Sequence, residues 1–400
     1  MRTPWLRLVS ESNVYCMGEI KNVAQRARRA RPRVVIAGAG VAGLETLLAL
    51  RALAGDRVDV TLIAPELQFI DRSMAVIEPF KYRRAAGVRI QDIADEFDAR
   101  WCRRVLDRVE HERRVAVTRD GVELPYDHLV LAPGARPEHE WSSSGWPTPD
   151  GWLTFDDARD EGPYRLLLHH LREGRVRKLA FVKPTGVSRP LPLYDLALLT
   201  AADCAAHQQS EVELSMITPE AEPLAIFGAH VSAGVRRLLD AAGVGLYAGS
   251  YVTGMRRGRL ALCPGEWQLS VDRVVSEPRL VGPRLRGIPC GPDGFIHTDL
   301  YGRVAGREGV LAAGHATAFP IKHGGLAAQQ ADAVAEAIAS SIGVAIDPQP
   351  FRPILHGVLL TGSGARYLRA DIRGGASDAM SEQRADTDPS DVHTAEMSAL

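Results

Sequence analysis

A glycine-rich turn between a predicted strand and a predicted helix constrains the fold of this chain more than any other feature. Residues 33–43 read Arg-Val-Val-Ile-Ala-Gly-Ala-Gly-Val-Ala-Gly, and an apolar helix-forming stretch follows over residues 44–53. In a dinucleotide-binding turn of this kind, Gly38 permits the tight turn, Gly40 lets a diphosphate approach bare backbone, and Gly43 lets the helix pack against the strand. The free N–H groups and the positive end of the helix dipole then face the diphosphate. We therefore predict a nucleotide site at this turn.

The surrounding sequence separates this prediction from its alternative, a glycine-rich structural turn. The chain has 37 glycines, so the glycine spacing alone is weak support. Residues 57–63 alternate as a second strand, however, and complete a βαβ unit of about 30 residues. The acid that binds the adenosine ribose ordinarily follows the glycines by about 20 residues. Ala64 takes the commonest place for that acid and Glu66 follows it, so Glu66 either reaches the ribose or is a surface residue.

The composition is that of an ordinary globular protein, with 46% hydrophobic and 24% charged residues. A length of 400 residues predicts two or three domains. The net charge of -1 gives no electrostatic footprint for nucleic acid or anionic lipid, and we interpret the arginines of residues 26–33 as a solvated leader. No apolar run approaches the roughly 18 residues that span a bilayer, and the polar C-terminal tail has no apolar face. We therefore expect a cytoplasmic protein with no nucleic-acid partner and no stable membrane anchor.

The cysteines and histidines lack the spacing of a metal site. No CxxC pair occurs among the cysteines, and the histidines have no HxxxH or cysteine partner at ligand spacing. In a chain without a secretion signal, such cysteines are expected to be free buried thiols rather than disulfides. We therefore predict no metal site. The five cysteines are Cys16, Cys102, Cys204, Cys263 and Cys290.

A second α/β unit begins at Lys178, but its glycine loop is degenerate. Where a strand would open a glycine-rich loop, residues 181–186 read Phe-Val-Lys-Pro-Thr-Gly, with a single glycine. A second nucleotide pocket is therefore left open as a question. Apolar periodicity places the remaining strands at 115–118, 122–124, 126–132, 179–182, 213–217, 251–262, 273–275 and 309–313, and helices at 193–207, 232–242 and 326–341.

The two ends of the chain differ from the rest in pattern. Residues 1–32 show little periodicity, and we treat them as an N-terminal extension in which Met17 is an alternative start to Met1. Residues 374–400 are dominated by Ser, Asp, Glu, Thr and Ala, with almost no large apolar side chains. Such a segment cannot bury enough apolar surface to order itself, so we predict a disordered tail.

Three separated segments carry a family resemblance: the βαβ unit at 34–63, the strand and turn Leu-Val-Leu-Ala-Pro-Gly-Ala-Arg at 129–136, and Gly-Val-Leu-Ala-Ala-Gly-His-Ala-Thr at 309–317. In this order they resemble the pyridine nucleotide-disulfide oxidoreductase superfamily of flavoproteins, over about residues 33–370. The resemblance implies an α/β fold with two Rossmann-like, glutathione reductase-type domains, the second inserted in the first. The expected ranges are 33–160 and 277–345 for an FAD-binding domain, 161–276 for the inserted NAD(P)-type domain and 346–373 for a small C-terminal segment.

Two further stretches resemble one branch of this superfamily. Residues 182–197 resemble the start of the second domain in sulfide:quinone reductases, and residues 320–330 resemble the segment that those enzymes and type II NADH dehydrogenases place beside the isoalloxazine. Two residues depart from the pattern. Arg189 stands where sulfide:quinone reductases have a reactive cysteine, and His315 stands where family members have an Asp that accepts a hydrogen bond from FAD. A neutral imidazole accepts one hydrogen bond, so His315 either leaves FAD binding intact or weakens it.

The resemblance also implies a set of cofactor-binding residues. Lys322, the candidate catalytic residue, and the helix start at Leu326 would stabilise negative charge on the reduced flavin. The alternative for Lys322 is an ordinary loop lysine. Arg72 and Arg136 either neutralise phosphate or lie on the surface. The implied FAD-binding residues are Gly38, Gly40, Val41, Ala42, Gly43, Glu66, Arg72, Pro133, Gly134, Gly314, His315, Lys322, Gly325 and Leu326.

The implied activity is that of an FAD-dependent oxidoreductase. Hydride would pass from NADH or NADPH to flavin N5 and then, as two electrons, to a quinone or another small acceptor, with the cofactor doing the chemistry. Two alternatives stay open: a sulfide- or thiol-linked flavoprotein, and a nucleotide-binding regulator that keeps the fold without turnover. The expected partners are a small electron donor and a small acceptor, and a homodimer is the hypothesis for assembly.

Overall fold

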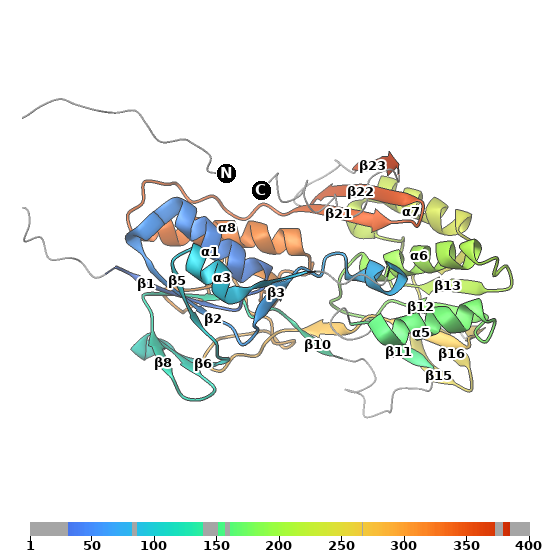
Figure 1. Ribbon diagram of the computed structural model, residues 1–400, viewed down its shortest axis with the longest axis horizontal. Helices are drawn as coiled ribbons and strands as arrows, with labels where there is room; N and C mark the ends of the chain where they lie inside the picture. The colour runs from blue at the N-terminus through green and yellow to red at the C-terminus, as the bar shows by residue number, and fades with distance from the viewer. Residues whose placement is uncertain are drawn as a thin grey trace, which may run out of the picture.

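The computed structural model describes residues 31–81, 86–138, 151–156, 161–265, 267–372 and 379–384. Figure 1 shows two domains side by side, each built on a sheet with helices above it. Each of these two main sheets has five strands, all of them parallel. The α/β fold predicted from the sequence is therefore confirmed.

The first sheet gathers strands from both ends of the chain. Its strand order is β20 (Val310–Ala312), β9 (His128–Leu131), β1 (Arg33–Ala37), β2 (Asp59–Ile63) and β5 (Ala99–Cys102). Because side chains alternate along a strand, Val34 and Ile36 enter the core on one face of the sheet, and Val35 and Ala37 enter the core on the other. Burial on both faces explains why this strand is continuously apolar.

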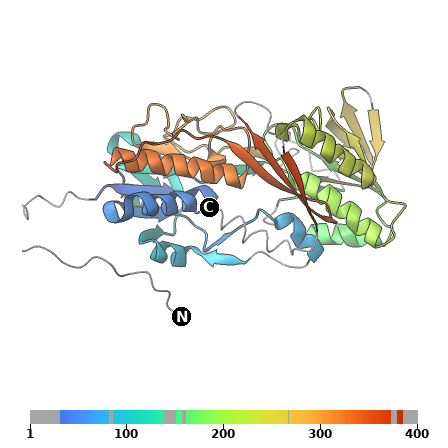
Figure 2. The same cartoon turned by 90° about the horizontal axis from the view of Figure 1, so that it is seen from above.

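Two helices cover one face of the first sheet. Helix α1 (Val41–Ala54) and helix α8 (Gly324–Ser341) run side by side there, as Figures 1 and 2 both show. Each helix begins two or three residues earlier than the apolar pattern predicts, because the apolar pattern does not register the small residues of the first turn. Short elements flank this layer: β3 (Gln68–Ile70), α2 (Glu78–Lys81), β4 (Gly87–Arg89) and α3 (Ile90–Glu96).

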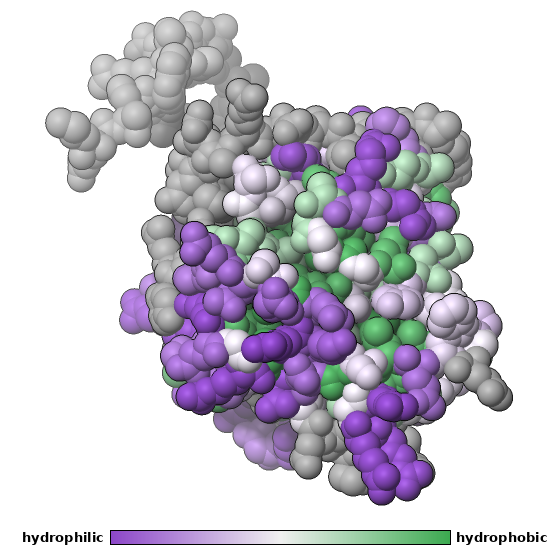
Figure 3. Space-filling model, turned by 90° about the vertical axis from the view of Figure 1, so that its right-hand side faces the viewer, coloured by the Kyte–Doolittle hydropathy of each residue, from purple (hydrophilic) through white to green (hydrophobic). Residues whose placement is uncertain are grey.

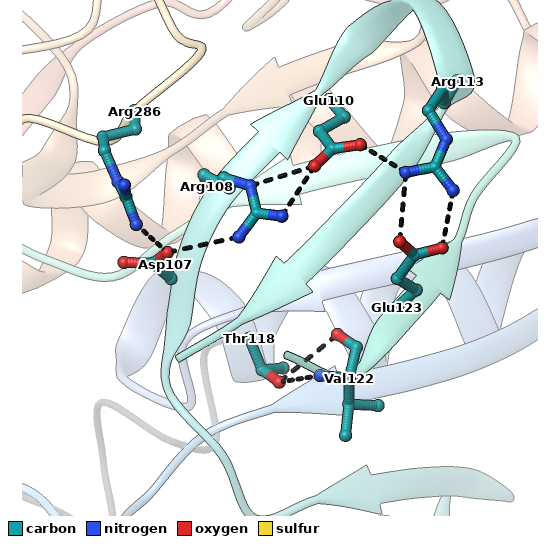
Figure 4. A network of polar contacts seen from close by, with 8 residues as sticks. All are labelled: Asp107, Arg108, Glu110, Arg113, Thr118, Val122, Glu123 and Arg286. Atoms are coloured by element: carbon teal, nitrogen blue, oxygen red, sulfur yellow. Dashed lines mark hydrogen bonds and ion pairs between the residues drawn. The ribbon is translucent and has the colours of Figure 1, made fainter. Parts of the chain in front are cut away.

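The other face of the first sheet carries a small antiparallel sheet. Its strands are β6 (Leu106–Glu110), β7 (Val115–Thr118) and β8 (Glu123–Pro125), of which β6 has no counterpart in the predicted hairpin. A chain of surface ion pairs and hydrogen bonds crosses these strands (Figure 4), and pairs of this exposure stabilise a fold only slightly. The side chains are Asp107, Arg108, Glu110, Arg113, Glu123 and Arg286, and Thr118 bonds separately to the backbone of Val122.

The second sheet forms from the inserted segment. Its strand order is β11 (Trp152–Thr154), β18 (Arg273–Ser276), β12 (Lys178–Val182), β13 (Glu213–Ile217) and β14 (Val244–Tyr247). Helices α5 (Glu161–Arg172), α6 (Pro192–Ala206) and α7 (Ala229–Ala241) share the core of one face. The antiparallel strands β15 (Tyr251–Arg256), β16 (Arg259–Cys263) and β17 (Trp267–Ser270) cover the other.

One domain boundary differs from the prediction. Strand β11 pairs with β18 of the second sheet, although residues 152–154 were expected in the FAD-binding domain that ends at 160. A strand of three residues has no readable periodicity, and its partner lies far along the chain. The chain crosses between the domains at β10 (Arg136–Glu138) and β19 (Arg279–Val281), which pair antiparallel.

The C-terminal segment forms a three-stranded antiparallel sheet. Its strands are β21 (Ile354–Leu360), β22 (Gly364–Asp371) and β23 (Ala379–Arg384), and Figure 2 shows them crossing from the first domain towards the helices of the second. Strand β23 lies inside the range 374–400 that the composition predicts to be disordered. That prediction is wrong for 379–384, because pairing with β22 satisfies the backbone of a segment that has few apolar side chains. Residues 385–400, and residues 1–30 of the extension, lie outside the described part of the chain.

The surface gives limited information about partners. Figure 3 looks onto the end of the second domain, where green hydrophobic residues at the centre of the face are bordered by purple hydrophilic ones. No helix among the described residues has the length and apolar character needed to cross a bilayer.

Candidate functional site

The three glycines of the first turn meet three different surroundings. Gly38 has a φ of +116°, and a Cβ on it would lie 2.1 Å from the carbonyl oxygen of Ala132. A Cβ on Gly43 would lie 1.9 Å from the carbonyl oxygen of Gly38, whereas a Cβ on Gly40 would have no heavy atom within 4 Å. Two of the glycines thus let the chain pack closely, and the third leaves open space. Gly38 and Gly43 therefore sit where only a glycine fits, and the binding of a diphosphate at Gly40 stays a prediction.

Gly314 brings the late segment against the same turn. Its φ is +73°, and a Cβ on it would lie 2.7 Å from Cβ of Ala42 in α1 and 3.5 Å from Cβ of Ala327 in α8. The Gly314 N–H donates to the side-chain carbonyl of Gln330 at 2.7 Å, which fixes this backbone to the second turn of α8. The first turns of two helices, each with the positive end of its dipole, therefore meet at one glycine.

His315 follows Gly314 and holds an unpaired acceptor. Its Nε2 is buried and has no hydrogen-bond partner. Burial, followed by the charges of Lys322 and Arg189, lowers the pKa of His315 to about 4, against a hydrogen bond to the backbone of His323. The ring is therefore neutral at pH 7. Because Nε2 has no partner, the bond to His323 uses Nδ1, and the neutral ring presents a lone pair at Nε2.

Lys322 is buried to an extent that is rare for lysine. Its side chain is 1% exposed, and Nζ donates to the carbonyl oxygens of Thr317 at 2.6 Å and Phe319 at 2.8 Å. Nζ also lies 3.9 Å from the ring centroid of Phe295. Burial lowers the pKa of Lys322 to about 7. An ammonium has three N–H donors, so one is left for a partner beyond these two carbonyls. The alternative of an ordinary loop lysine does not fit this burial.

His323 caps the helix that Lys322 precedes. Its Nδ1 accepts a hydrogen bond from the backbone N–H of Gly325 at 3.2 Å, and burial lowers its pKa to about 4. The Gly325 N–H, which the resemblance assigns to the cofactor, is therefore already paired within the chain. Leu326 follows it and is buried.

The remaining predicted residues lie at varied depths. Gly134 has a φ of +75° with open space around it, and Pro133 and Glu66 are exposed. Arg72 is half-buried in the loop after β3. Arg136 donates to the carbonyl oxygen of Gly282 at 3.3 Å, so it helps to join β10 to β19.

Sequence reasoning did not find three residues that shape this site. Gln330 holds Gly314, His323 caps α8, and Phe295 covers Lys322. Each acts through a contact whose geometry depends on the folded chain, so neither periodicity nor motif spacing could have identified its partner.

The cysteines lie on other segments. Cys102 ends β5, Cys204 is in α6, Cys263 ends β16 and Cys290 is exposed in a loop. Cys16 lies outside the described residues. Among the residues that the structure describes, no group of three potential metal ligands comes together. The segments that meet at Gly314 therefore carry no thiol.

No model of a known protein family matches the chain. Among solved structures, the sulfide:quinone oxidoreductase of Aquifex aeolicus is similar, with a TM-score of 0.78 and 18% identity over 88% of this chain and 87% of that one. A ferredoxin reductase of Rhodopseudomonas palustris gives a TM-score of 0.65 and 17% identity, over 86% and 84%. An NAD-dependent persulfide reductase of A. fulgidus gives a TM-score of 0.60 and 18% identity. The match covers 84% of this chain and 64% of that longer chain.

At identities this low, the structural similarity establishes a shared fold alone. The fold is the two-domain arrangement with the second Rossmann-like domain inserted in the first, as the motif order implied.

Proposed function

We propose that this chain is an FAD-dependent oxidoreductase that passes two electrons through the flavin from a small donor to a small acceptor. The observation that carries this proposal is the junction at Gly314, where the starts of α1 and α8 meet beside a buried lysine. A glycine-lined junction of two helix starts suits a ligand with a diphosphate and an electron-accepting ring.

The residues at this junction fit FAD. Gly40 leaves open space where a diphosphate needs bare backbone, and no acidic residue stands in the first turn of α1 to repel it. The lone pair at Nε2 of His315 would accept a hydrogen bond from a hydroxyl of the ribityl chain. The resemblance gives this role to an Asp in the family members. Exposed Glu66, which follows β2, would bind the adenosine ribose.

FAD, when bound, would supply the two-electron chemistry. The chain's own part is to bind and orient it. The N–H groups of Val41 and Ala42 would hold the diphosphate. The third N–H of Lys322, held in place by Thr317 and Phe319, would stabilise negative charge on the reduced ring system.

A small cavity beside the junction is the candidate binding site for a small acceptor. Its volume is about 260 Å³, and its walls include Gln330, which binds Gly314, and Phe319, which binds Lys322 through its carbonyl. The edge-to-face pair Phe319 and Phe351 makes one wall apolar. A quinone is the acceptor that the sequence suggests. The similar structures are named for sulfide, quinone, persulfide and ferredoxin, so they support electron transfer and leave the acceptor to experiment.

The thiol-linked alternative has less support. It needs a cysteine thiolate near the flavin, and the junction segments carry none. The place of the reactive cysteine holds Arg189, whose guanidinium lies 3.7 Å from the carboxylate of buried Glu277.

The proposal is tested by the colour of the purified protein. We expect absorbance near 450 nm and about one FAD per chain, and bleaching when a donor is added without oxygen. Colourless protein that cannot be reconstituted with FAD would contradict the proposal and leave the non-catalytic regulator. Anaerobic mixing with NADH and with NADPH then tests the donor that the sequence predicts.

A further inference from the structure

The two βαβ units of this protein can be aligned by position in their helices. In the first unit, β1–α1–β2, the residue before the helix is Gly40 and the third helical residue is Gly43. In the second unit, β12–α6–β13, the same positions hold Leu191 and Tyr194. The strands that complete the units end alike: Ile-Ala-Pro-Glu at 63–66 and Ile-Thr-Pro-Glu at 217–220.

Tyr194 places a large ring at the helical position where Gly43 lets helix and strand pack closely in the first unit. Its side chain is fully buried, and its hydroxyl donates to Oε2 of Glu220 at 2.5 Å. The hydroxyl of Thr218 donates to the same oxygen at 3.0 Å. Glu220 corresponds to Glu66, the acid proposed for the adenosine ribose in the first unit. Glu220 is already bound by two hydroxyls of the protein.

The start of α6 is also closed to a diphosphate. Pro192 is the first helical residue and has no N–H to offer. Leu191 before it is buried under β21, where a Cβ on Gly357 would lie 2.8 Å from the Leu191 side chain. Asp195 in the first turn is buried and accepts the backbone N–H of Leu360 at 2.8 Å. The C-terminal sheet thus covers the start of α6.

A buried lysine holds the loop before α6 in this closed form. Nζ of Lys183 donates to the carbonyl oxygens of Arg189 at 2.9 Å and Pro190 at 3.3 Å. It also lies 3.8 Å from the carboxylate of Glu277 and 5.8 Å from the ring centroid of Tyr194. The loop is therefore tied to the same cluster that surrounds the tyrosine ring.

We infer that Tyr194 closes the second domain to dinucleotides, so that the electron donor of the flavin is not NADH or NADPH bound in this domain. The inference rests on the proposed FAD site and narrows the donor. Tyr194 is a specificity-determining residue: its ring fills the first turn of α6, and its hydroxyl binds the acid that would otherwise bind the ribose.

The first test uses the FAD-loaded wild-type protein, in which FAD blocks the first site. NADH, NADPH and AMP are each titrated by calorimetry, and the absorbance is followed anaerobically. We expect no saturable binding up to about 1 mM, the upper end of common substrate affinities. We also expect no bleaching by either nucleotide, while photoreduction bleaches the flavin. Saturable binding at lower concentration, or stoichiometric bleaching by NADH or NADPH, would overturn the inference. Absence of flavin would instead defeat the proposed function.

The second test assigns the closure to Tyr194. Tyr194→Ala removes the ring and one of the two hydroxyls bound to Glu220, so its AMP affinity should rise at least about tenfold over the wild type. Tyr194→Phe keeps the ring and serves as the matched control, with affinity unchanged. A folded Tyr194→Ala protein that binds no AMP would overturn the role of Tyr194. Tyr194→Leu, which shortens the side chain but keeps it apolar, replaces it if the alanine variant does not fold, with the same two outcomes.

Discussion

The helix of the βαβ unit begins differently in the two domains. In the first domain, the start of α1 opens onto free space at Gly40 and meets α8 at Gly314. In the second, the start of α6 is covered by β21, and its first turn is filled by Tyr194 and Asp195. Strand pairing and buried apolar residues are nevertheless similar. The comparison teaches that packing maintains a βαβ unit, whereas a nucleotide site depends on a few positions where the side chain is missing.

Removing the ring that fills the second unit should have the largest effect on stability. Tyr194→Ala deletes a fully buried aromatic side chain, which costs about 3–5 kcal/mol of unfolding free energy. Tyr194→Phe should cost about 1 kcal/mol, because Thr218 still binds Glu220. Urea unfolding of both variants measures the difference. Equal losses would mean that the hydrogen bond, rather than the ring, stabilises the second unit.

Filling the close contact of the first unit should have the next largest effect. Gly43→Ala places a Cβ 1.9 Å from the carbonyl oxygen of Gly38, so helix and strand must separate. Overpacking of this kind costs about 1–3 kcal/mol. Thermal unfolding of the FAD-free protein checks the stability, and FAD affinity should fall with it. An unchanged Tm would show that the turn relaxes freely and that the comparison overstates its rigidity.

The buried lysine adds a pH dependence that only the first domain should show. Burial lowers the pKa of Lys322 to about 7, so it is charged below pH 7 and neutral above it. A charged Lys322 favours the reduced flavin, and its charged fraction falls about tenfold from pH 6 to pH 8. The rate of anaerobic flavin reduction should fall by a similar factor.

Lys322→Met is the control for this prediction, since it keeps an apolar side chain and has no proton to lose. Its reduction rate should be low and nearly independent of pH between 6 and 8. If this variant keeps the pH dependence of the wild-type reduction rate, the titrating group is not Lys322.

The smallest effect on stability is expected at the open glycine. Gly40→Ala adds a Cβ with no heavy atom within 4 Å, so the FAD-free protein should keep its Tm. The added Cβ enters the space proposed for the diphosphate, so the FAD affinity of Gly40→Ala should fall without a loss of stability. In Gly43→Ala, by contrast, FAD affinity and stability should fall together. Unchanged FAD binding in Gly40→Ala would place the diphosphate elsewhere.

The first βαβ unit could be predicted because its information is local. Glycine spacing, an apolar strand and a helix pattern lie within about 30 consecutive residues, and the structure places β1, α1 and β2 there. The order of the three motifs also sufficed for the two-domain fold.

The rest depended on contacts between distant residues. The contact of Gly314 with Ala42 and the bond from Tyr194 to Glu220 join separate segments and leave no periodic trace. The sequence of the second unit indicated only that the glycines are absent. The side chains that fill the start of its helix could be identified only in the folded structure. Strand β11 was assigned to the other domain for the same reason: three residues pair with a strand far along the chain.

The bond between Gly314 and Gln330 has a consequence for biosynthesis. The first domain starts the chain, yet its junction is complete only after β20 and α8 have been made. All strands of the second sheet lie between β9 and β20, so that sheet can pair while the first still lacks its last strand. At about 5–20 residues per second, synthesis separates the two events by several seconds. The domain that comes first from the ribosome is thus the last to finish folding.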